Sequence, residues 1–131
     1  MKDSTPADSD VVKFVLDEID SVPHLEALLL LWNSRPALWT PEELAHRLYV
    51  KPDVVRSLLQ DLVRQGLIGV GQNPDERYRY TPVSDERDRL IGRLDATYRR
   101  EVVRVSTMIH SKPSSAIRDF ARAFRFTKER E

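Results

Sequence analysis

Cysteine is absent from this 131-residue chain, so disulfide bonds and zinc–thiolate sites are excluded. Glycine is scarce, and the four glycines form no phosphate-binding loop. No apolar run follows a basic start, and none approaches the length that spans a bilayer. An excess of positive charge is missing too, because 21 basic residues balance 21 acidic ones. We therefore expect a cytoplasmic protein with no membrane partner.

Residues suited to catalysis or metal binding are not grouped in the sequence. His24, His46 and His110 lie far apart and have no metal-ligand spacing. Asp75 and Glu76 fall in an expected turn, where solvation explains them, and no serine lies in a nucleophile-elbow pattern. We predict that the protein is not an enzyme and has no catalytic residues, no metal site and no cofactor.

Two short helical segments are present at residues 40–66. Thr40 can cap the first, a proline follows at its first position, and Glu43 completes a capping box. A second apolar repeat at helical spacing begins after Pro52 and ends at Gly66. Two short helices joined by a tight turn predict a helix-turn-helix.

A β-hairpin is predicted directly after these helices. Residues 67–71 form one expected strand, residues 72–76 a polar turn, and residues 77–80 a returning strand in which arginines alternate with tyrosines. The order of helix pair and hairpin resembles the winged helix-turn-helix family over roughly residues 24–82. The residues that carry the resemblance are Glu43, Leu44, Ala45, Leu48, Val55, Leu59, Leu62, Gly66, Leu67, Ile68 and the run from Arg77 to Pro82.

Helices are also predicted before this unit. Residues 1–8 are a polar tail that we expect to be disordered, and Ser9 or Asp10 can cap a first helix. A second helix, from His24 to about Asn33, is apolar nearly all round, which predicts a central helix covered on more than one side. The acidic end of the first helix is either solvated or meets the basic C-terminal region, within the molecule or across a dimer.

The chain after the hairpin is predicted to be a helical extension. One helix is expected from Ser84 to about Ser111, and Ser114 or Ser115 can cap a last one. The first would be roughly 40 Å long. The winged domain cannot cover all of its apolar stripe, so a second copy is the expected partner. The expected dimer interface comprises Leu90, Leu94, Tyr98, Val102, Val105, Ile109, Phe120 and Phe124.

These patterns predict a mainly α fold with a small β-hairpin. Its expected parts are a disordered tail at residues 1–8, an N-terminal helix with a winged helix-turn-helix domain at residues 9–83, and a C-terminal dimerisation or docking extension at residues 84–131. The segment from Ser114 to Glu131 has three alternative roles: docking on the dimer partner, on another protein, or on an acidic membrane surface. Its short helix and few large apolar residues disfavour the membrane.

The resemblance implies binding to double-stranded DNA, with the second helix of the pair in the major groove. In that helix Arg56 could pair with guanine and Gln60 with adenine, although an arginine can equally be an ordinary solvated charge. Phosphate contacts are expected from Lys51 and from the hairpin arginines, with helix-start amides as a second anchor. The expected DNA-binding residues are Thr40, Lys51, Arg56, Ser57, Gln60, Arg64, Arg77 and Arg79.

Two functions are therefore compatible with the sequence. The first is a homodimeric, sequence-specific transcriptional regulator, whose helices outside the winged domain resemble the dimerisation elements of MarR, ArsR or PadR regulators. The second is a winged-helix protein–protein interaction module, an adaptor or regulatory partner that does not bind DNA. An acidic hairpin tip favours the second function, as does the small excess of charge in residues 51–80, with five basic against four acidic side chains.

Overall fold

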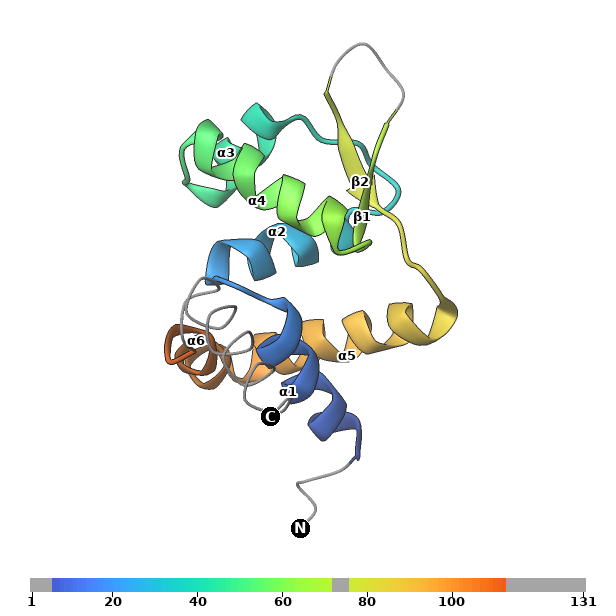
Figure 1. Cartoon of the computed structure of the whole chain (residues 1–131), viewed down its shortest axis with the longest axis vertical. Coiled ribbons are helices and arrows are strands. Elements are labelled where there is room, and N and C mark those ends of the chain that lie inside the picture. Colours follow the sequence, from blue (N-terminus) through green and yellow to red (C-terminus); the bar gives the residue numbers. More distant parts are fainter. Residues whose placement is uncertain (1–5, 72–75, 113–131) are drawn as a thin grey trace, which may run out of the picture.

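The computed structural model describes residues 6–71 and 76–112, which form six helices and one two-stranded antiparallel sheet (Figure 1). The predicted mainly α fold with a small hairpin is confirmed. In chain order the elements are α1 (Pro6–Glu18), α2 (Val22–Asn33), α3 (Pro41–Leu48), α4 (Pro52–Arg64), β1 (Ile68–Val70), β2 (Tyr78–Tyr80), α5 (Asp85–Arg100) and α6 (Val102–His110).

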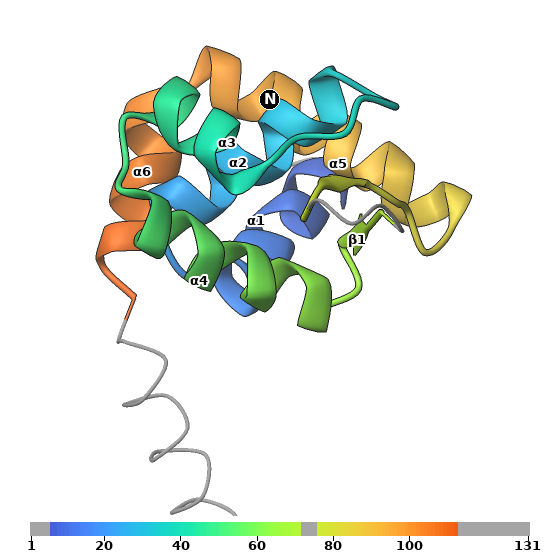
Figure 2. The same ribbon diagram turned by 90° about the horizontal axis from the view of Figure 1, so that it is seen from above.

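Helix α2 is the centre of the fold, as its apolar sequence predicts. Helices α3 and α4 and the hairpin pack against it on one side, and α5 and α6 on the other (Figures 1 and 2). Leu25, Leu28 and Leu31 are fully buried. The helix begins two residues earlier than expected, because Ser21 accepts a hydrogen bond from the backbone N–H of His24 and proline is tolerated in a first turn.

The helix-turn-helix forms as the local signals predict. The Thr40 hydroxyl accepts a hydrogen bond from the Glu43 N–H at 3.1 Å, and the Glu43 carboxylate accepts one from the Thr40 N–H at 2.9 Å. Tyr49, with φ of 58°, makes the turn into α4 and is exposed. Gly66 ends the second helix with φ of 76°, a conformation that glycine adopts without steric cost.

The hairpin places its tyrosines inside the protein. Tyr80 pairs with Ile68 and Tyr78 with Val70; both tyrosines are buried, while Arg79 between them is exposed. The predicted alternation is therefore confirmed. Trp39 forms an isolated antiparallel β-bridge with Tyr78, which the sequence did not predict. Its N–H and C=O form backbone hydrogen bonds of 2.9 and 2.8 Å with Tyr78.

The prediction of one continuous helix over residues 84–111 is wrong. Ser84 caps α5 as expected, but the helix ends at Arg100, and Glu101 (φ −134°, ψ 54°) separates it from α6. The turn lets α6 pack back on α5, α1 and α2. Leu94, Val105 and Ile109 of the stripe are therefore covered within one chain.

This packing changes the expected dimer surface. Leu94, Val105 and Ile109 are buried in the core of the single chain, so they hold the extension in place from within. Leu90 and Tyr98 are only partly buried, and Val102 is exposed. Phe120, Phe124 and the expected last helix lie outside the described residues.

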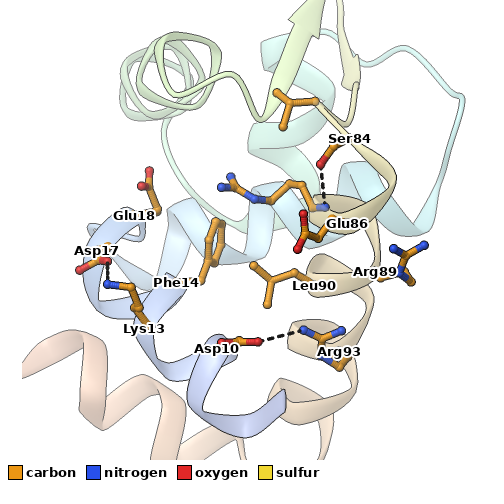
Figure 3. Close-up of a pocket in the computed structure, with 12 residues that line it drawn as sticks. Asp10, Lys13, Phe14, Asp17, Glu18, Ser84, Glu86, Arg89, Leu90 and Arg93 are labelled. Atoms are coloured by element: carbon orange, nitrogen blue, oxygen red, sulfur yellow. Dashed lines mark hydrogen bonds and ion pairs between the residues drawn. The ribbon is translucent and has the colours of Figure 1, made fainter. Parts of the chain in front are cut away.

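Helix α1 packs on α5 through a mixed apolar and charged contact (Figure 3). The guanidinium of Arg87 lies 5.1 Å from the ring centre of Phe14, and Arg93 forms an ion pair with Asp10 at 3.8 Å. These residues border a surface cavity of about 590 Å³ between the two helices. The Asp10 pair lies near the start of α1; at the acidic end of the helix, Asp17 forms an ion pair with Lys13 of the same helix at 3.4 Å.

Both ends of α1 have features that the sequence did not predict. The helix begins at Pro6, one turn before the expected cap, and proline suits a first helical position. Its acidic C-terminal end receives donors from distant segments. The ammonium of Lys112 donates to the carbonyls of Val15 and Ile19, and the Gln65 amide donates to the carbonyl of Glu18 at 2.7 Å. The carbonyl of Val15 also accepts the backbone N–H of Ile19 at 3.1 Å, so the long-range donors add to the hydrogen bonding at this helix end.

Candidate nucleic-acid interface

The outward face of α4 is polar and accessible. Its apolar face, Val55, Leu58, Leu59 and Leu62, is buried. At about 100° per residue, Asp53, Ser57, Gln60 and Arg64 lie near the middle of the opposite face, and all four are exposed. Three of these, the serine, the glutamine and the arginine, belong to the set predicted from the sequence.

Arg56 lies at one edge of this face and is surrounded by carboxylates. Its guanidinium donates a hydrogen bond to Glu42 of α3 and lies 3.6 Å from Glu76 and 3.8 Å from Asp53. The hydrogen bond to Glu42 and the charge of that residue, followed by the charge of Glu76, raise the pKa of Arg56 above its ordinary value. The predicted guanine-reading arginine therefore joins α3, α4 and the connection between the hairpin strands, and its charge is neutralised there.

Glu76 extends this contact into the sheet. Its second carboxylate oxygen accepts a hydrogen bond from the Tyr78 hydroxyl. Burial, with the hydrogen bond to Glu76 and the charge of that residue, raises the pKa of Tyr78 to about 12. The position of the hairpin relative to α4 is thus held by a chain of contacts from Arg56 through Glu76 to a buried tyrosine.

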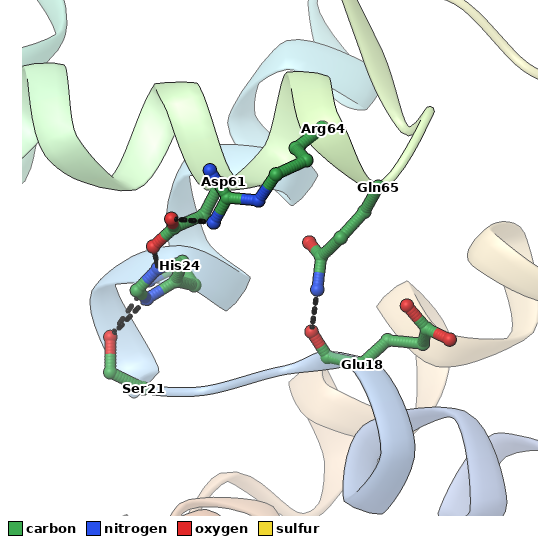
Figure 4. Close-up of polar contacts among 6 residues, drawn as sticks. All are labelled: Glu18, Ser21, His24, Asp61, Arg64 and Gln65. Atoms are coloured by element: carbon green, nitrogen blue, oxygen red, sulfur yellow. Dashed lines mark hydrogen bonds and ion pairs between the residues drawn. The ribbon is translucent and has the colours of Figure 1, made fainter. Parts of the chain in front are cut away.

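The other edge of the α4 face is held by Asp61 (Figure 4). One carboxylate oxygen lies 2.8 Å from Nε2 of His24 on α2, and the other accepts a hydrogen bond from Arg64. The ring nitrogen Nδ1 of His24 lies 2.6 Å from the Ser21 hydroxyl. Burial acts to raise the pKa of Asp61, but the hydrogen bonds from His24 and Arg64 outweigh it and hold that pKa below its ordinary value.

The contact between His24 and Asp61 was not predicted from the sequence. His24 and Asp61 are 37 positions apart, so no local spacing connects them. The one signal available was helical phase, since Asp61 falls at the border between the buried and exposed faces of α4.

The remaining predicted residues have different environments. The hydroxyl and the backbone N–H of Thr40 are used in the capping box, so they stabilise α3. Lys51 is exposed at the start of α4 and makes no side-chain cap hydrogen bond. Arg79 is exposed on β2, and Arg77 beside it is partly exposed. Arg64 lies eight residues beyond Arg56, about 12 Å along the axis of α4.

None of the helices in residues 6–71 and 76–112 is both long enough and apolar enough to cross a membrane.

Comparison with known proteins identifies the fold of this chain through similar solved structures, but not through its sequence. No protein-family model matches the sequence, and no curated protein matches it significantly. Among solved structures, the chain is similar to the YusO protein from Bacillus subtilis, with 17% identity, 94% of this chain and 82% of that chain covered, and a TM-score of 0.54.

Two further solved structures are similar to this chain to about the same degree. A MarR family protein from Bacillus stearothermophilus is 18% identical over 95% of this chain and 84% of its own, with a TM-score of 0.53. The MarR family transcriptional regulator SPO1453 from Silicibacter pomeroyi DSS-3 is 18% identical over 81% and 74%, with a TM-score of 0.51. The fold is therefore a winged helix of the MarR type.

Proposed function

We propose that this protein is a DNA-binding transcriptional regulator that presents α4 to the major groove. The observation that carries the proposal is the outward face of α4: Ser57, Gln60 and Arg64 are exposed there, next to a hairpin that carries the exposed Arg79. The likeness in fold to MarR family regulators supports it.

The proposed contacts divide by type. Ser57 and Gln60 meet base edges, with the amide of Gln60 suited to adenine. Lys51, Arg64 and Arg79 contact phosphates, which fix position without reading sequence. Arg56 has a different role in this proposal from the one expected from sequence, because its guanidinium already binds Glu42. It fixes the angle between α4 and the hairpin.

We propose further that the extension from residue 84 onward carries a dimer contact. Val102 is 46% exposed and Val103 is 78% exposed, side by side at the start of α6. Together with the partly buried Leu90 and Tyr98 they offer apolar surface to a second copy. Two α4 helices would then meet half-sites about 10 bp apart, or a multiple of that distance. Molar-mass measurement by light scattering tests this, with Val103→Glu expected to give a monomer.

Binding of duplex DNA over a salt series tests the DNA proposal. The probe is mixed genomic duplex, followed by the sequence that it enriches. We expect log affinity to fall steeply with log salt, with a slope of about −5 if six phosphates are contacted. Arg79→Ala should weaken binding to all sequences and reduce the slope by about 1, because it removes one phosphate contact.

Two further variants separate base contacts from general charge. Gln60→Ala should leave the slope unchanged and lower the preference for one base pair by roughly 1–3 kcal/mol. Arg89→Ala removes an exposed positive charge from α5, on the other side of α2 (Figures 1 and 3), and should change neither property. A folded protein that binds no duplex at about 50 mM salt would refute the proposal.

A second candidate function is a protein-interaction module. The neutralisation of Arg56 by Glu42, Asp53 and Glu76 favours it, because these acids weaken the attraction of this surface for phosphate. Absence of DNA binding, with the fold intact by circular dichroism, is the result that this candidate predicts.

A further inference from the structure

We propose that Asp20, His24 and Asp61 form a binding site for a divalent transition-metal ion such as zinc. One ligand atom from each residue lies within 4.8 Å of the other two. The aspartate at position 20 comes from the linker between α1 and α2, the histidine from the first turn of α2, and Asp61 from α4. The stretch that leads into α2 thus meets a residue of α4 that lies 37 positions beyond His24.

The imidazole is already oriented as a metal ligand requires. Nδ1 of His24 lies 2.6 Å from the Ser21 hydroxyl, which fixes the ring with Nε2 toward Asp61 (Figure 4). Metal-binding histidines commonly use their second ring nitrogen in such a hydrogen bond. The Ser21 hydroxyl is itself held in place, because it also accepts the N–H of residue 24 as the cap of α2.

The distances fit coordination after small movements. Tetrahedral bonds of about 2.0–2.1 Å place neighbouring ligand atoms about 3.3 Å apart. Nε2 and the Asp61 oxygen are now 2.8 Å apart, so they must separate by about half an ångström. The carboxylate of Asp20 lies within 4.8 Å of both other ligand atoms, so it must approach by at most about 1.5 Å. Asp20 is an exposed linker residue, so a change of rotamer can provide this movement.

The donor set and the surrounding charge fit a divalent ion. One imidazole and two carboxylates suit zinc and other first-row metals better than calcium, which takes oxygen ligands. Arg64 binds the second oxygen of Asp61 and leaves the oxygen facing His24 for the metal. The carboxylates of Asp20 and Asp61 supply negative charge to a divalent ion, and the three protein ligands leave a further position for water.

Titration of zinc into the tag-free protein tests the site, followed by calorimetry and by the imidazole NMR signals. We expect one ion per chain and a perturbed signal from His24, but not from His46 or His110. At a zinc concentration one hundred times the dissociation constant, the melting temperature should rise by roughly 10 °C. His24→Ala should abolish binding, and Asp20→Asn, which leaves the His24–Asp61 contact in place, should weaken it at least tenfold.

The chain offers a matched control. His46 and His110 are both exposed, so the double variant His46→Ala/His110→Ala removes histidines that could hold zinc adventitiously and should bind as the wild type does. Failure of zinc to bind would overturn the proposal, as would binding that either His24→Ala or Asp20→Asn leaves unchanged. Because every readout is metal binding itself, these results do not depend on whether the protein binds DNA.

Discussion

Asp88 connects the two sides of the molecule, and its removal gives a stringent test of the fold. Asp88 lies on α5. One of its carboxylate oxygens accepts a hydrogen bond from the indole N–H of Trp32 on α2 at 3.1 Å and another from the hydroxyl of Tyr80 on β2 at 2.8 Å. Burial and this hydrogen bond raise the pKa of Tyr80 above its ordinary value. In Asp88→Ala both donors lose their acceptor.

The size of the effect follows from these contacts. A hydrogen bond to a charged group contributes about 1.5–3 kcal/mol, so two such bonds set an upper range of about 3–6 kcal/mol. The side chain of Asp88 is 42% exposed, and water can replace part of what is lost. We therefore expect the free energy of unfolding to fall by about 2–3 kcal/mol, which lowers the melting temperature by roughly 10 °C in a domain of this size.

Thermal unfolding followed by far-ultraviolet circular dichroism measures this change. Glu86→Ala is the matched control, because it removes an acidic charge from the same first turn of α5, where the helix dipole contributes about 0.3–1 kcal/mol. The side chain of Glu86 makes no hydrogen bond or ion pair within the described part of the chain. Asp88→Asn, which keeps a weaker acceptor, should fall between the two. If Asp88→Ala and Glu86→Ala melt within about 2 °C of each other, Asp88 does not join α2, β2 and α5 energetically.

Three further predictions follow from individual contacts. Glu42→Gln should raise the affinity for duplex DNA roughly two- to fivefold at low salt, because it frees part of the charge of Arg56; unchanged or weaker binding would contradict this. Because the pKa of Asp61 is lowered in the folded protein, its charged form stabilises the fold above about pH 4, and this contribution is lost as the pH falls through the folded value. In urea titrations between about pH 5 and pH 3, the wild type should thus lose more stability than Asp61→Asn, and equal losses would count against the contact. Gly66→Ala should cost about 1–2 kcal/mol from its positive φ alone, since the added methyl group would lie an ordinary 3.5 Å from Val83; a loss below about 0.5 kcal/mol in the same assay would show that the turn relaxes.

Several local elements were readable from the sequence because their causes act within a few residues. The capping box of Thr40 and Glu43 needs only a spacing of three. The stop at Gly66 depends on one residue that reaches a positive φ, and the buried tyrosines of β2 follow from the period of two in a strand. In the candidate interface, helical phase alone gave the exposure of Ser57 and Gln60.

Other features depended on packing between segments far apart in sequence. The break at Glu101 follows no proline or glycine, and it lets α6 bury side chains against α1 and α2. Lys112 donates to a carbonyl of α1 that lies 97 residues earlier.

The two edges of α4 show the same division between sequence and tertiary structure. The sequence by itself determined which face of α4 is polar, because amphipathic periodicity is a local property. It did not determine that Arg56 meets Glu42 and Glu76, nor that His24 meets Asp61. Ion pairs and hydrogen bonds form wherever packing brings their atoms within a few ångströms. Those distances were decided by how α2, α3 and the hairpin settle against α4.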